Sequence, residues 1–443
     1  MKPITTFIAV LLISFQGVAQ QEDRSLTLKE AQQLAVENAY SVKDKQLEYQ
    51  KARQTIKETA SQGLPQISAG FDFTYNAQLA KQPVPAEFFG GAEGTFAYVT
   101  FGTKYQNSAS LSLNQLILDG SYFVALQASR VYKESARLDK EISEQEIKKD
   151  VAQAYYGVLV SEETVEIVRE NMSSLEKNLR ETKALYDNGF VEEQDVDQLE
   201  LLVSNLNNNL NRAQRQYDLA KMMLNFRLGR NVDAEISLTN SIDDVLRDEG
   251  MLITDNFSVE DNINYRSISI QEKGAQLSVR NEKMKYLPTL SGFVRHGQNN
   301  YQDDLGRAWS TDEYWIPNTA IGFSLKWNIL QGLGRPATVE KAKLDLERAE
   351  VAMEITKSQL QLQYGQAKSN YEYMYDNYNT QMRNVELSKK IRDKTRVKYT
   401  EGISSSLDLT QAENQYLEAQ QEYLNALQSL LNAKEELILA IGK

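Results

Sequence analysis

The stretch from Tyr399 to Lys443, YTEGISSSLDLTQAENQYLEAQQEYLNALQSLLNAKEELILAIGK, decides the fold because the chain contains it twice. Shifted back by 213 positions without a gap, so that Tyr399 falls on Tyr186, it lies on the stretch that ends at Arg230. A repeat spaced by about half of the chain length indicates an internal duplication. The aligned pairs include Gly189 with Gly402, Asp195 with Asp408, Glu200 with Glu413 and Gly229 with Gly442.

Both copies carry an apolar stripe with the spacing of a long helix. In the second copy the stripe consists of Leu409, Ala412, Tyr416, Ala419, Tyr423, Ala426, Leu430, Ala433 and Leu437. Steps of three and four, sustained over many turns, are typical of a helix that packs along a seam. A Gly precedes and another Gly closes each copy, and Gly adopts the left-handed conformation that ends helices. The pattern predicts a helix after a tight turn in each half.

Composition excludes several classes of protein. The 443 residues carry a net charge of -12 and no basic block, so nucleic acid is not expected as a partner. The chain has no Cys and a single His, His296, which removes disulfides, thiolate catalysis and the commonest metal ligand. We therefore predict no catalytic residues, no cofactor and no metal site, and hence no enzyme. Seven Pro and 22 Gly are few for this length and favour long helices.

The N-terminus has the features of an export signal. Lys2 precedes an apolar run over residues 4–15, and the small residues Gly17 and Ala19 follow it. We predict that residues 1–19 are a cleaved signal peptide; a buried N-terminal amphipathic helix is the alternative. The exported chain then has no apolar run long enough for a transmembrane helix, so it would have to cross a membrane as β-strands.

The first repeat is predicted over residues 20–230. It begins with a helix over residues 27–62, where Thr27 caps and Glu30 completes a capping box. Residues 67–76 then alternate strictly between apolar and polar, as a barrel strand with lipid outside and water inside would. Strands are expected at about 66–77 and 108–118, with a loop over 77–106 between them. A helix over residues 121–188 and the first duplicated helix form a long hairpin.

The second repeat is predicted over residues 259–443, after an acidic linker or equatorial segment at 231–258. Its strands are expected at about 288–298 and 319–330, around a polar loop at 297–318. A helix over residues 337–400 and the final helix complete the second hairpin. The last helix also carries a second apolar stripe beside the first, which indicates a neighbour on each side, as in a curved wall of helices. That stripe is Leu417, Leu424, Leu427, Leu431, Ile438 and Ile441.

Four membrane-type strands cannot close a barrel. An open edge in lipid leaves unpaired backbone groups, each at a cost of several kcal/mol. Several copies of the chain must therefore share one barrel.

The order and duplication of these elements resemble the outer-membrane efflux protein family, the TolC-like channels. The resemblance rests on the Tyr-x-x-Gly turns with Asp six residues after the Gly, and on the strand ends Leu118-Asp119-Gly120 and Leu330-Gln331-Gly332. It implies a mainly α fold with a transmembrane β-barrel portion, closed as a homotrimer with twelve strands and continued by an α-barrel tunnel. It also implies an outer-membrane exit duct that conducts substrates passively, surrounded by outer-membrane lipid. The implied partners are a periplasmic adaptor protein and an inner-membrane transporter.

The resemblance also implies a gate at the periplasmic end of the tunnel. Tyr399 matches a gate tyrosine, Asp195 its acceptor on the other hairpin, and Asp408 a ring of acidic residues. Gly189 and Gly402 match the helix-tip turns where the adaptor docks. Ser404 and Gln411 depart from the family pattern at a gate arginine and a second acidic ring, which indicates a weaker lock. The alternative is that Asp195 and Asp408 simply cap their helices.

Three other classes of protein remain as alternatives. A periplasmic coiled-coil scaffold or adaptor would need no alternating strands, a secreted enzyme would need a constellation of catalytic residues, and a diffusion porin would need more strands per chain. The sequence does not identify the substrate, the class of pump or the open or closed state.

Overall fold

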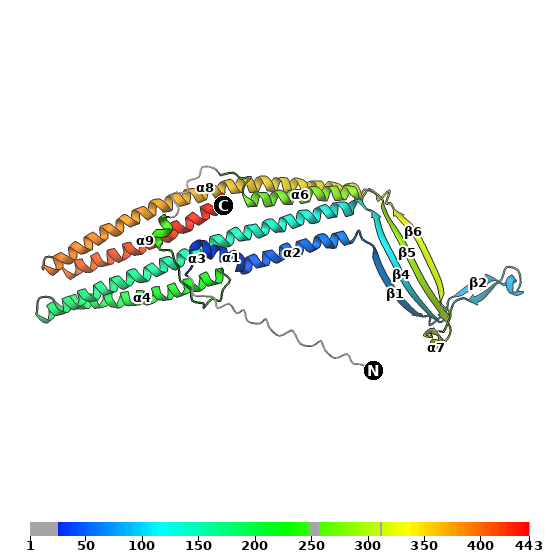
Figure 1. Ribbon diagram of the computed structural model, residues 1–443, viewed down its shortest axis with the longest axis horizontal. Coiled ribbons are helices and arrows are strands. Elements are labelled where there is room, and N and C mark those ends of the chain that lie inside the picture. Colours follow the sequence, from blue (N-terminus) through cyan, green and yellow to red (C-terminus); the bar gives the residue numbers. More distant parts are fainter. Residues whose placement is uncertain (1–24, 248–256, 311, 443) are drawn as a thin grey trace, which may run out of the picture. The chain divides into compact units, whose positions relative to one another are not determined.

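A computed structural model describes residues 25–247, 257–310 and 312–442 (Figure 1). The chain forms two compact units. The helical unit comprises Met1–Asp44, Ser143–Ser258 and Gln361–Lys443, and the sheet unit comprises Lys45–Ile142 and Val259–Leu360. The predicted signal peptide at 1–19 lies outside the described residues.

The helical unit is built from the two predicted hairpins. In one, α3 (Gly120–Asp187) turns into α4 (Glu193–Arg227); in the other, α8 (Gly334–Thr400) turns into α9 (Ser406–Ile441). Gly189 and Gly402 occupy the turns with φ angles of 75° and 72°, so the left-handed conformation expected at both positions is observed. The duplication in sequence is therefore a duplication in structure.

The core of the helical unit brings both hairpins together with the N-terminal helix α1 (Leu28–Asn38). Tyr155 and Tyr156 on α3 are completely buried, and they connect α3 to different elements. The Tyr155 hydroxyl donates to the Leu26 carbonyl at 2.9 Å, and the Tyr156 hydroxyl donates to Glu435 of α9 at 2.7 Å. The short helix α5 (Ile242–Arg247) packs on the same core through Val245. Buried phenols paired in this way fix the relative positions of these segments.

The single helix expected over residues 27–62 is divided. α1 ends at Asn38, Ala39 has extended backbone angles (φ -57°, ψ 138°), and α2 (Tyr40–Ser61) begins directly afterwards. The cause is the turn after α4, because Gly229 lies so close that a Cβ there would be 2.4 Å from the Asn38 carbonyl oxygen. This long-range contact has no signal in the local sequence.

The sheet unit contains a four-stranded antiparallel sheet in the order β1-β4-β5-β6. The strands are β1 (Gln66–Tyr75), β4 (Tyr105–Leu118), β5 (Thr289–Gln302) and β6 (Ile316–Lys326). The helix α6 (Ile263–Met284) leads into β5, as α2 leads into β1. Within the described chain β1 and β6 are the edge strands (Figure 1).

The strand register separates an apolar face from a polar face. Phe71 of β1 pairs with Ala109, Ala109 with Gln298, and Gln298 with Pro317, so alternate residues share one face across all four strands. The apolar face carries large exposed side chains, namely Ile67, Phe71, Phe73, Tyr75, Leu111, Val294, Ile321, Phe323 and Leu325. The opposite face is mainly polar and carries Ser68, Asp72, Thr74, Ser108, Ser110, Ser112, Arg295, Asn299, Ser324 and Lys326, together with Phe293, Tyr301 and Ile316. The apolar face in turn includes the polar residues Asn107, His296, Gln298 and Asn300. This is the alternation expected of a strand between lipid and water.

Several boundaries differ from the sequence-based expectation. The stretch 77–106, expected to be a loop, contains a separate hairpin of β2 (Lys81–Pro85) and β3 (Phe96–Thr100) around the 3-10 turn η1 (Ala86–Phe89). β4 and β5 are longer than expected, and β6 ends earlier, at Lys326. Within the loop predicted at 297–318, a short helix α7 (Leu305–Ala308) precedes β6. The hairpin was missed because both strands have only five residues and β2 contains two Pro.

Across the described ranges, none of the helices has both the length and the hydropathy that a bilayer-spanning helix needs.

We predict that Gly229→Ala destabilises the helical unit more than Gly189→Ala does. Both positions have positive φ, 67° and 75°, so each substitution costs roughly 1–2 kcal/mol in backbone strain. Only Gly229 also meets backbone atoms, which adds about 1–3 kcal/mol of overpacking, whereas a Cβ at Gly189 has nothing within 4 Å. The check is thermal unfolding of the two variants in detergent; equal midpoints would contradict the proposed contact.

Candidate functional site at the helix turns

The two helix turns have nearly the same backbone geometry. At the α3–α4 turn the Gly189 N–H donates to the Tyr186 carbonyl at 2.8 Å, and at the α8–α9 turn the Gly402 N–H donates to the Tyr399 carbonyl at 3.0 Å. The residue after each Gly then donates to the preceding turn of the helix, Phe190 to Leu185 and Ile403 to Lys398. Each turn thereby satisfies the last carbonyls of its helix.

Asp195 and Asp408 both occupy the third position of the following helix, where each completes a capping box. Asp408 accepts from the Ser405 N–H at 3.1 Å, from the Ser405 hydroxyl at 2.8 Å and from the Ser404 hydroxyl at 3.1 Å. Both Asp residues therefore cap the helices in which they lie, as the alternative interpretation of the sequence predicted. The hydrogen bonds from Ser405 hold the pKa of Asp408 below its ordinary value, so this exposed carboxylate stays charged at neutral pH.

Tyr399 contacts the other hairpin, but through Thr182 and not through Asp195. The Tyr399 hydroxyl lies 3.5 Å from Oγ1 of Thr182 on α3. Asp195 instead accepts from the hydroxyl of Ser406 on α9 in a short hydrogen bond, while its other oxygen accepts from the Glu192 N–H at 3.1 Å. Within the single chain Tyr399 therefore does not pair with Asp195, because the capping geometry turns the Asp195 side chain toward the start of its own helix; the gate role of the two residues stays a prediction. Burial raises the pKa of Tyr399.

A buried carboxylate lies one turn further into the hairpins. Glu413 of α9 is 7% exposed, and Asn178 of α3 donates to it at 3.4 Å. Burial raises the pKa of Glu413, and the positive charges of Arg392 and Arg396 on α8 oppose that effect. Its counterpart in the first repeat, Glu200, is exposed and pairs with Lys183 at 2.6 Å. The duplication therefore places the same residue type in two different environments.

Further polar contacts join the two hairpins above this level. Asn171 donates to Gln420 at 2.8 Å, and Arg396 lies 3.8 Å from Glu181. Within the second hairpin, the Arg392 guanidinium of α8 stacks over the Tyr416 ring of α9 at 4.3 Å from its centroid. These hydrogen bonds and the ion pair accompany an apolar cluster at the same end of the hairpins, in which Leu417 of α9 packs against Leu199 and Leu202 of α4 and their neighbours.

Sequence reasoning placed Tyr399, Asp195, Asp408 and both turn glycines at one end of the helical hairpins, and the structure brings them together there. It did not find Thr182, Ser406, Asn178 or Glu413. Only Glu413 carried a usable signal, because it aligns with Glu200 in the duplication. The other three are small polar residues of helices, buried in the structure, whose partners lie more than 200 positions away in the chain.

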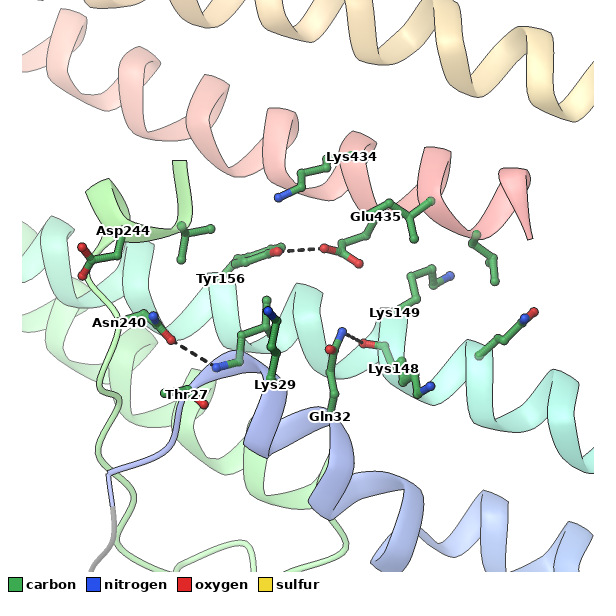
Figure 2. A pocket seen from close by; sticks show the side chains of 15 residues that line it. Thr27, Lys29, Gln32, Lys148, Lys149, Tyr156, Asn240, Asp244, Lys434 and Glu435 are labelled. Carbon is green, nitrogen blue, oxygen red and sulfur yellow. Dashed lines mark hydrogen bonds between the residues drawn. The ribbon is translucent and has the colours of Figure 1, made fainter. Parts of the chain in front are cut away.

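A polar hollow of ≈ 400 Å³ lies elsewhere in the helical unit, between α1, α3, the segment before α5 and α9 (Figure 2). Figure 2 shows Tyr156 and Glu435 facing each other across it, and Gln32 bonded to the carbonyl of Lys148 at 3.2 Å. None of the residues predicted to form the gate lines this hollow. Its cationic lining consists of Lys29, Lys148, Lys149 and Lys434.

No group of three or more His, Cys, Asp or Glu residues with the arrangement of a metal site occurs in the part of the chain that the structure describes.

The sequence of residues 31–230 and 266–443 matches the family model described as outer membrane efflux protein. The chain belongs to this family. The two matched segments lie within the two predicted repeats, and together they cover most of the chain. The chain is thus an outer-membrane efflux channel, an exit duct from a family of channels and not of enzymes.

Solved structures of outer-membrane channels share the fold of this efflux channel. CusC is 14% identical with a TM-score of 0.75, over 94% of this chain and 92% of that chain. The open state of MtrE from Neisseria gonorrhoeae is 16% identical with a TM-score of 0.73, over 94% and 88%. VceC from Vibrio cholerae is 14% identical with a TM-score of 0.68, over 94% and 96%. Comparison with curated proteins gave no sequence match.

We predict that Glu413→Gln flattens the pH dependence of the channel's stability. A raised carboxyl pKa means that the folded protein binds the proton more tightly than the unfolded chain. The free energy of unfolding then falls as the pH rises from the ordinary value of 4.5 through the raised folded value. Gln cannot ionise, so this decline disappears in the variant.

The measurement is thermal unfolding in detergent from about pH 4 to about pH 8, with Glu200→Gln as the matched control from the other repeat. Glu200 is exposed, so its variant should retain the decline. A Glu413→Gln profile that matches the unmodified channel would show that Glu413 does not titrate in the buried state.

Proposed function

We propose that this efflux channel is the passive exit duct of a tripartite system. It conducts substrates from the periplasm to the exterior when a periplasmic adaptor and an inner-membrane transporter dock below it. The observation that carries the proposal is the four-stranded sheet with one mainly apolar and one mainly polar face. The same chain carries duplicated helical hairpins, which hydrogen bonds between Tyr399 and Thr182 and between Ser406 and Asp195 join near their turns. The chain performs no catalysis; the transporter supplies the energy.

Trimer formation follows from the edges of the sheet. β1 and β6 each have an unpaired side in the single chain, and the face they share carries Ile321, Phe323 and Phe71 at 77%, 76% and 54% exposure. Lipid would cover this apolar face but could not hydrogen-bond the strand edges. Pairing β6 of one chain with β1 of the next satisfies both edges, and three chains close the barrel.

Adaptor docking is supported by apolar residues at the turns. Phe190 follows Gly189 and is 78% exposed, while Ile403 follows Gly402 and is 71% exposed. The two positions are equivalents in the duplication. Large apolar side chains at the end of a polar hairpin are typical of a contact surface for another protein.

A periplasmic scaffold or adaptor, the alternative considered from the sequence, is favoured by no observation in the structure. It would use the same helical hairpins but not the apolar face of the sheet. Insertion into lipid vesicles separates the two proposals, because a scaffold would stay soluble without detergent. Export through the predicted signal peptide at 1–19 is part of the proposed function, as is the placement of the helical unit in the periplasm.

We predict that Tyr399→Phe enlarges the single-channel conductance in a planar bilayer. The substitution removes the hydroxyl contact with Thr182 that joins α8 to α3, so the hairpins separate more easily. Ser406→Ala, which removes the contact with Asp195, should have the same direction of effect. The matched control is Tyr186→Phe, the equivalent of Tyr399 in the first repeat, whose ring is 41% exposed. If Tyr186→Phe opened the channel as much as Tyr399→Phe, the assigned lock would be wrong.

We predict that Asp408→Asn reduces the cation selectivity of the current. Three copies of a carboxylate that is ionised at neutral pH would attract cations around a narrow axis. Reversal potentials in a salt gradient report the change, and Asp233→Asn, at an exposed position away from the turns, serves as the control. Unchanged selectivity in Asp408→Asn would leave this residue with its capping role alone.

A further inference from the structure

The β2–β3 hairpin carries a concentrated group of exposed aromatic side chains. Five lie within residues 88–101, and each is more than half exposed. They are Phe88 at 79%, Phe89 at 64%, Phe96 at 63%, Tyr98 at 71% and Phe101 at 56%. A monomeric soluble surface rarely concentrates aromatic residues in this way without a function.

Register places two of these aromatic side chains on one side of the hairpin, while Phe88 and Phe89 lie in the η1 turn between the strands. Phe96 pairs with Pro85 and Tyr98 pairs with Pro83, so two aromatic–proline pairs share a face. The other face carries the exposed Gln82 and the partly buried Val84, Ala97 and Val99. An isolated two-stranded hairpin is marginally stable in water, and nothing in the described chain covers the aromatic–proline face.

The hairpin continues directly from an aromatic belt at the end of the sheet. Phe73 lies 5.0 Å from Trp309 and Tyr75 lies 5.2 Å from Tyr105, measured between ring centroids, and Phe73, Tyr75 and Tyr105 all stand on the apolar face. Two segments connect the hairpin to this belt. They are joined by a hydrogen bond in which the Asn76 N–H donates to the Lys104 carbonyl at 2.8 Å. Aromatic rings at the rim of a membrane sheet mark the level of the lipid headgroups.

Charge and backbone chemistry favour lipid over a protein partner. Within residues 77–104, Lys81 and Lys104 balance Glu87 and Glu93, so the hairpin is neutral in a chain of net charge -12 and is not repelled by an anionic leaflet. Pro83 and Pro85 have no N–H to donate, which makes β2 a poor edge for the addition of a strand from a second copy.

We propose that the aromatic–proline face of the β2–β3 hairpin docks on the outer surface of the membrane, where its rings insert among the lipids of the outer leaflet. The hairpin thereby extends the aromatic belt beyond the sheet and anchors the external end of the channel. This inference rests on the proposed placement of the sheet in the outer membrane.

The test uses single-cysteine variants of the full-length channel, because the chain has no native Cys. Phe88→Cys, labelled with an environment-sensitive fluorophore, is reconstituted in phosphatidylcholine–phosphatidylglycerol vesicles that contain a spin-labelled quencher lipid. The matched control is Phe190→Cys at the α3–α4 turn, which removes a Phe of nearly equal exposure, 78% against 79%. Ile321→Cys on the apolar face of β6 reports whether the sheet itself is in the bilayer.

Docking predicts at least about twofold stronger quenching at position 88 than at position 190, with the label emission shifted to the blue. Adding Phe96→Ser and Tyr98→Ser to the Phe88→Cys variant should abolish the difference. Quenching at position 321 without quenching at position 88 would overturn the inference and leave the proposed function intact. A blue-shifted but unquenched label at position 88 would also overturn it and would indicate contact with a second copy. No quenching at either position would overturn the membrane placement as well.

Discussion

Hydrogen bonding at the two edge strands of the sheet is the constraint on which the rest of the structure depends. β1 and β6 end the order β1-β4-β5-β6 with unpaired backbone groups, while the face between them is apolar. Such a sheet is stable in lipid only when other chains pair with both edges. In the helical unit, polar contacts such as Tyr399 with Thr182 and Ser406 with Asp195 join the two hairpins near their turns.

The duplication supplied two equal frameworks that have taken different chemical roles. The two turns match closely in backbone geometry, from the positive φ of the Gly to the capping box six residues later. Side chains at equivalent positions differ in environment, since Tyr399 contacts Thr182 where Tyr186 is exposed, and Glu413 is buried where Glu200 pairs with Lys183. Helix geometry is thus repeated, whereas the contacts between hairpins are particular to each repeat.

Features that depend on neighbouring residues could be predicted from the sequence, whereas features that depend on contacts between distant residues could not. The long helices and the alternating strand β1 were predicted well, because their periodicity repeats over many residues. The break at Ala39 was not, because its cause is the approach of Gly229 from a distant part of the chain. The β2–β3 hairpin was predicted as a loop, because β2 contains two Pro and the alternation in β3 extends over only five residues. Asp195 was predicted to accept a hydrogen bond from Tyr399. In the single chain Asp195 instead accepts from the Glu192 N–H at the start of its own helix, and Tyr399 contacts Thr182.

By itself the sequence determined the duplication, the class of each long element, the need for several chains to close the sheet and the family to which the chain belongs. These properties depend on periodicity, composition and local turn chemistry, all of which lie within short windows of sequence. Only the tertiary structure decided which side chains meet between the hairpins, that Glu413 and not Glu200 is buried, and that an aromatic face stands free on the external hairpin. Such contacts join residues far apart in the chain, and local sequence carries no record of which distant partner each residue meets.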